Sequence, residues 1–91
     1  RSTYSFFRKS SNGKNNLLFI INMTPIHWEN YKLGVPKKKK YKLLLNSAEE
    51  RFGGAGGTIP SEITALKENC DYKDYSITLD LPPYAAAVFV F

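Results

Sequence analysis

Ninety-one residues are enough for one small domain and no more. A hydrophobic fraction of 43%, with 14% aromatic residues, supports a modest core and excludes an intrinsically disordered chain, and no apolar run approaches the roughly 20 residues of a membrane-spanning helix. Thirteen Lys and Arg residues against eight Asp and Glu give a net charge of +5, but four of the cations form the single run 37–40, so a nucleic-acid partner is not expected.

Taken in chain order, the periodic stretches are short and typical of β-strands. Turn-forming residues separate them, beginning with the Ser-Ser-Asn-Gly cluster at 10–13. Pro25 and Pro36 close two of the stretches, because proline cannot donate to a strand ladder. The predicted strands are 4–9, 17–22, 31–35, 41–46, 75–81 and 84–91, with 62–66 either a further strand or a single helical turn.

The connections between these strands carry their own predictions. The lysines at 37–40 are expected to cap a hairpin between strands 31–35 and 41–46, where they also protect strand edges from pairing with other molecules. The glycines and the proline of 48–61 predict a loop. Several short strands with turn signals between them predict an all-β fold, either an antiparallel sandwich or a barrel.

No complete catalytic or metal site can be assembled from the reactive residues. His27 and Cys70 are each the only residue of their kind, and two such ligands cannot make a structural zinc site without carboxylates. Neighbouring carboxylates are expected to raise the pKa of Cys70, which makes its thiol a weaker nucleophile at neutral pH. The glycine-rich segment 53–57 lacks the lysine of a phosphate-binding loop. The adjacent carboxylates Glu49 and Glu50 are expected to face solvent and to form no acid–base pair. The residues therefore predict a non-catalytic module without metal or cofactor.

Aromatic residues are the one excess that points to binding. Trp28 and Tyr31 lie beside one polar turn, and Tyr72 and Tyr75 lie beside another. Exposed aromatic rings can stack on sugars or bases, although closing the ends of the sandwich core is the favoured interpretation. Trp28 has the most polar surroundings and is the best exposed candidate. The single cysteine forms no internal disulfide and suits a reducing cytoplasm.

Five short motifs occur along the chain in an order typical of one protein family. They are NMTP at 22–25, YKLGVP at 31–36, Y…LNS at 41–47, FGG at 52–54 and LPPYA at 81–85. In this order, over nearly the whole chain, the sequence resembles the C-terminal all-β domain of bacterial 1,4-α-glucan (glycogen) branching enzymes, in the α-amylase superfamily. Ala48 stands where the family usually has Asp, and the segment 67–74 has no counterpart in the family pattern.

The resemblance implies an antiparallel Greek-key β-sandwich of about seven or eight strands that follows a catalytic (β/α)₈ barrel. Residues 1–91 would be a single C-terminal domain, and both chain ends lie so close to predicted strands that a fragment of a larger enzyme is expected. The carboxylates that cut α-1,4 bonds and form α-1,6 branches would lie in the barrel, so no catalytic residue is expected here. A cytoplasmic role in glycogen biosynthesis follows, without cofactor, nucleic acid or membrane.

The partners that the resemblance implies are the barrel of the same chain and, in some members, α-glucan such as glycogen or amylose. Trp28 and Tyr31 are the candidates for a glucan contact. Two alternatives stay open: the C-terminal domain of another α-amylase-superfamily enzyme, and an autonomous carbohydrate-binding module. A small basic nucleic-acid-binding barrel is a more distant alternative.

A docking face is predicted from strands that are apolar on both sides. Strands 17–22 and 84–91 have this character, whereas a two-sheet sandwich covers only one side of each strand. Adjacent residues of a strand point to opposite faces. Some of four phenylalanines are therefore expected to be uncovered and to meet the barrel, since exposed apolar patches mark interfaces. The four candidates are Phe6, Phe7, Phe89 and Phe91.

Overall fold

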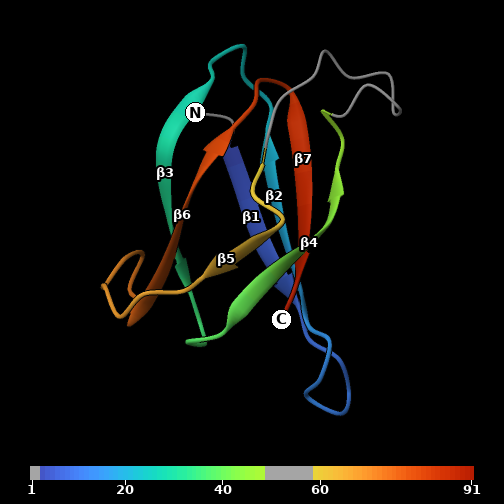
Figure 1. Cartoon of the computed structure of the whole chain (residues 1–91), viewed down its shortest axis with the longest axis vertical. Coiled ribbons are helices and arrows are strands. Elements are labelled where there is room, and N and C mark those ends of the chain that lie inside the picture. The colour runs from blue at the N-terminus through green and yellow to red at the C-terminus, as the bar shows by residue number, and fades with distance from the viewer. Residues whose placement is uncertain (1–2, 49–58) are drawn as a thin grey trace.

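The computed structural model of the chain describes residues 3–48 and 59–91, and these form two antiparallel β-sheets (Figure 1). The described strands are β1 (Thr3–Arg8), β2 (Leu17–Asn22), β3 (Trp28–Val35), β4 (Lys40–Asn46), β5 (Glu62–Thr64), β6 (Tyr75–Leu81) and β7 (Ala85–Val90). The larger sheet has the order β1-β2-β7-β4-β5, and β3 pairs with β6 in the second sheet. The predicted all-β sandwich is confirmed. Within the described residues, no helix is long and apolar enough to span a membrane.

Turn and proline signals place most strands where the sequence predicts them. β2 and β6 have the predicted bounds, because turn residues or prolines flank them on either side. β3 begins three residues earlier than predicted, at Trp28. The ambiguous segment 62–66 contains the short strand β5, which pairs with the start of β4. Most of the predicted loop 48–61 lies outside the described residues.

The connection between β3 and β4 corrects the prediction of a hairpin. β3 pairs with β6 in one sheet, whereas β4 pairs with β5 and β7 in the other. The chain therefore crosses between layers at Pro36 and the lysine run, instead of turning back within one sheet. Val35 and Tyr41, on either side of this crossing, are both fully buried. Burial of both residues between the layers favours the crossing over a hairpin, which would hold both strands in one layer.

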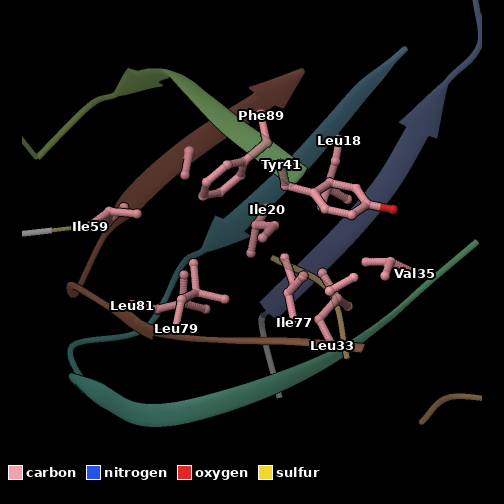
Figure 2. Packing of buried hydrophobic residues seen from close by; sticks show 12 residues of the cluster. Leu18, Ile20, Leu33, Val35, Tyr41, Ile59, Ile77, Leu79, Leu81 and Phe89 are labelled. Atoms are coloured by element: carbon pink, nitrogen blue, oxygen red, sulfur yellow. The ribbon is translucent and has the colours of Figure 1, made fainter. Parts of the chain in front are cut away.

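The core lies between the two sheets and is built from alternate residues of each strand (Figure 2). From the larger sheet, Leu18, Ile20 and Phe89 point inward and are completely buried. Tyr41 is buried with them, and its hydroxyl donates a hydrogen bond to the backbone oxygen of Lys37 at 2.8 Å. Burial raises the pKa of Tyr41 to about 12, because the core disfavours the phenolate. The opposing sheet contributes Leu33, Val35, Ile77, Leu79 and Leu81.

Two of the sequence motifs have structural roles at strand ends. The buried amide of Asn22 donates to the backbone oxygens of Ile26 at 2.9 Å and Pro82 at 3.0 Å, and its oxygen accepts two hydrogen bonds from Thr24. Ser47 binds β7 instead: its Oγ accepts from the backbone nitrogen of Ala86 at 2.7 Å. These side chains replace the ladder hydrogen bonds that end where the strands end.

Candidate docking face

The side of the larger sheet that turns away from the core is apolar along the neighbouring strands β1, β2 and β7 and at Leu45 of β4. Residues directly opposite each other in an antiparallel pair point to the same side, so Phe19 of β2 shares this side with Phe6 of β1 and Val88 of β7. We call this surface the outer face. Its apolar members are Tyr4, Phe6, Leu17, Phe19, Ile21, Leu45, Ala86, Val88 and Val90.

Aromatic rings form a ridge on the outer face. Phe6 and Phe19 stack with their ring centroids 4.6 Å apart and their planes only 7° from parallel. Phe6 nevertheless stays 50% exposed, and Tyr4 beside it is 53% exposed. A large apolar side chain that is half in water after stacking has surface left for a partner.

A hollow of about 290 Å³ adjoins the ridge where β2 ends and β7 begins. Ile21 and Ala86 belong to the outer face and line its floor, while Met23 and Tyr84 stand at its edge and are 60% and 70% exposed. Its wall is mostly apolar, so it suits an apolar side chain of a partner better than a charged one. Among residues 3–48 and 59–91, the cations of the outer face stand at its other end, where Arg8 and Lys42 lie level with Leu17 and Val90.

The fold separates the four phenylalanines predicted as docking residues. Phe6 lies on the outer face. Phe89 is 0% exposed in the core, so the structure removes it from the candidates. Phe7 and Phe91 are half-buried, meet edge to face at 6.0 Å and pack against the core side. These positions follow from the alternation of strand residues, because 89 shares its side of the sheet with the buried positions 85 and 87.

The predicted glucan contacts Trp28 and Tyr31 lie on β3 and are half-buried against the core. The indole nitrogen of Trp28 is buried without a hydrogen-bond acceptor among the described residues, so most of the ring is shielded from solvent. This placement agrees with the favoured interpretation that these rings close one end of the core. A glucan contact stays a prediction.

The reactive residues form no site in the described part of the chain. Across residues 3–48 and 59–91, no cluster of three His, Cys, Asp or Glu side chains is arranged to hold a metal ion. Burial raises the pKa of the Cys70 thiol, and the charge of Asp71 raises it further; the sequence predicted the effect of the carboxylate but not that of burial. His27 is exposed. The predictions for Glu49, Glu50 and the glycines 53–57 fall outside the described residues.

Several outer-face residues were not singled out in the sequence, namely Tyr4, Phe19, Ile21 and Val88. The sequence does indicate that apolar residues lie on the outer side, because the strands that hold these residues are apolar on both sides. Without the register, however, the sequence does not say which alternate set faces the core. In β2, the residues that face the core are Leu18, Ile20 and the buried Asn22, so Phe19 and Ile21 face outward.

Comparison with known proteins gives a consistent result. Residues 1–91 match the family described as alpha amylase, C-terminal all-beta domain. The chain is 57% identical over its full length to a 1,4-alpha-glucan branching enzyme, GlgB, of Butyrivibrio fibrisolvens, and covers 14% of that protein. It is 38% identical over 97% of its length to GlgB of Francisella tularensis subsp. novicida, again covering 14%. It is 35% identical over 98% of its length to GlgB 1 of Clostridium perfringens strain 13, covering 13%.

Proposed function

Because this chain belongs to the family of alpha-amylase C-terminal all-beta domains, we propose that it is the non-catalytic C-terminal domain of a 1,4-α-glucan branching enzyme. In this role it packs on the catalytic (β/α)₈ barrel of the same polypeptide and supports its stability. The parent enzyme transfers α-1,4-glucan chains to form the α-1,6 branches of glycogen. The free thiol of Cys70 supports a reducing, cytoplasmic location.

The outer face is the observation that carries this proposal. Its apolar ridge and adjoining hollow have no covering layer among the described residues, whereas the opposite side of the same sheet is covered by β3 and β6. The chain spans only 13–14% of the length of the three curated relatives named above. The larger part of such a protein is therefore the natural occupant of the outer face.

An exchange experiment tests both the parent and the docking. The matching C-terminal segment of the Butyrivibrio fibrisolvens branching enzyme is replaced by this chain, and the hybrid is assayed for branching of amylose and for thermal unfolding. We expect an active hybrid that unfolds in a single transition. The 91-residue chain alone is expected to show no branching.

The outer-face variant Phe6→Ser is compared with Leu66→Ser in the same hybrid, because Leu66 is equally exposed at 54% but lies outside the outer face. Phe6→Ser is expected to lower the melting temperature by a few degrees or to split the transition in two, whereas Leu66→Ser leaves it unchanged. Equal effects of the two variants contradict docking through the outer face.

The other enzymes of the α-amylase superfamily that could contain this domain share its fold. They differ in the catalytic barrel against which the outer face would pack. A folded hybrid in which this domain melts on its own favours another α-amylase-superfamily parent. Binding of maltoheptaose by the isolated chain, seen as a change in Trp28 fluorescence, favours an autonomous carbohydrate-binding module. Only millimolar affinity is expected in that case, because one or two stacked rings contribute about 1–3 kcal/mol each.

A further inference from the structure

A cavity of about 370 Å³ opens at the end of the molecule opposite to the β6–β7 turn. The loop between β1 and β2, the β3–β4 crossing and the end of β7 meet there, in the lower part of Figure 1. The floor is apolar, because the rings of Phe7 and Phe91 line it. The two rings meet edge to face with their centroids 6.0 Å apart.

Three lysines that are distant in the sequence line this cavity. Lys9 follows β1, Lys37 lies in the β3–β4 crossing and Lys73 lies in the turn before β6. No acidic residue is among the lining residues, and the ammonium of Lys73 lies 5.9 Å from the centroid of the Phe7 ring. The fold thus gathers positive charge that the sequence distributes over three separate segments.

None of these lysines takes part in an ion pair within the described part of the chain. The ion pairs found there join Lys32 to Glu68 at 2.9 Å and Lys40 to Glu62 at 3.9 Å, and neither involves a cavity lysine. Asp71, in the turn that carries Lys73, accepts a hydrogen bond from the backbone nitrogen of Gly34. Three cations without an ion-pair partner among the described residues, gathered around one concave site, raise the local concentration of anions.

The wall of the cavity is held by a buried side chain. Asn16 is only 2% exposed, and its oxygen accepts a hydrogen bond from the backbone nitrogen of Ser10 at 3.1 Å. Its backbone pairs in both directions with that of Phe91, each bond being 2.9 Å long. The loop that carries Lys9 is thereby tied to Phe91, the residue that follows β7.

We propose that this cavity binds a phosphorylated organic molecule, with the phosphate at Lys9, Lys37 and Lys73 and the organic part on the rings of Phe7 and Phe91. Ammonium groups form charge-assisted hydrogen bonds to phosphate oxygens. The ring floor adds an apolar contact that inorganic phosphate cannot use. Such a site is independent of docking through the outer face, because the two surfaces share no lining residue.

Phenyl phosphate is the test ligand, since it combines the charge with a flat ring. It is titrated into the 91-residue chain, and binding is read from the NMR shifts of the Phe7 and Phe91 rings. Inorganic phosphate and phenol are titrated in parallel as charge-only and ring-only probes. We expect phenyl phosphate to bind several-fold more tightly than phosphate, phenol to give no saturable shift, and salt at about 0.5 M to weaken binding.

The double variant Lys9→Gln/Lys37→Gln is expected to weaken phenyl phosphate binding by about tenfold, because it removes two charge-assisted contacts. Lys67→Gln removes a charge on an exposed residue outside the cavity and is expected to leave the affinity unchanged. The proposal is overturned if phenyl phosphate gives no saturable shift, if it binds no more tightly than phosphate, or if the double variant binds as tightly as Lys67→Gln.

Discussion

At the scale of single residues, Gly34 has no room for a side chain. A Cβ built there would lie 2.1 Å from the backbone oxygen of Cys70, and the backbone nitrogen of Gly34 donates to a carboxylate oxygen of Asp71 at 3.0 Å. The clash is with backbone, so no flexible side chain can yield. We expect Gly34→Ala to lower the free energy of unfolding by about 3 kcal/mol, the upper end of the usual cost of overpacking, measured by urea denaturation.

Gly13 provides the contrast for this prediction. It has a φ of +74° and no atom within 4 Å of the Cβ position, so Gly13→Ala introduces backbone strain without a clash. A loss of about 1–2 kcal/mol is expected. Equal losses for the two variants would mean that the turn 70–73 moves away to make room for the new methyl group.

At the scale of elements, Asn22 links the end of β2 to the segments on either side of it in space. Its four hydrogen bonds reach Thr24, Ile26 and Pro82, and the side chain is completely buried. Asn22→Ala removes the amide that donates to the backbone oxygens of Ile26 and Pro82, and the bond to Pro82 is buried. We expect a loss of about 2–4 kcal/mol in unfolding free energy, whereas Asn69→Ala, at an exposed position, changes it by less than about 0.5 kcal/mol.

Circular dichroism of Asn22→Ala separates loss of stability from loss of the fold. The variant is expected to keep its strand signal at low temperature and to unfold at a lower urea concentration. A midpoint equal to that of Asn69→Ala would show that the four hydrogen bonds contribute nothing net to stability.

Strand positions could be predicted from the sequence far better than strand partners. β2 and β6 have flanking turn residues or prolines, which are local signals. The β3–β4 crossing was predicted wrongly, because a proline followed by lysines fits a hairpin tip as well as a crossing between sheets. The choice depends on β6 and β7, the partners of these strands, which lie far away in sequence.

The docking residues illustrate the same limit. Their chemistry is visible in the sequence, since adjacent phenylalanines in a strand must face opposite ways. Which phenylalanine is exposed depends on the pairing register. In the observed register, Phe89 lies in the core and Phe6 lies on the outer face. The cavity lysines were missed for a related reason, because Lys9, Lys37 and Lys73 converge only after three connections have folded.

At the scale of the whole molecule, the outer face predicts self-association of the isolated chain. Phe6→Ser removes a half-exposed ring from this face, so we expect weaker dimerisation in sedimentation experiments and less binding of a hydrophobic dye, with stability almost unchanged. Phe89→Ser has the opposite signature, because it removes a fully buried ring. It is expected to lower the unfolding free energy by about 3–5 kcal/mol.

A strictly monomeric wild-type chain that binds no dye would contradict the prediction. So would a Phe6→Ser variant that associates as strongly as the wild type. The comparison with Phe89→Ser is needed because partial unfolding also increases dye binding, and only that variant is expected to unfold.

The place of β7 in the larger sheet also bears on how the domain is made. β7 is the last of the described strands to leave the ribosome, yet it is the central strand that joins β2 to β4. Chains emerge at about 5–20 residues per second, N-terminus first, so β1 with β2, and β4 with β5, wait with open edges that other nascent chains can pair with. A stop codon before residue 85 therefore leaves the larger sheet as two disconnected ribbons, and the nascent chain depends on chaperones until β7 has emerged.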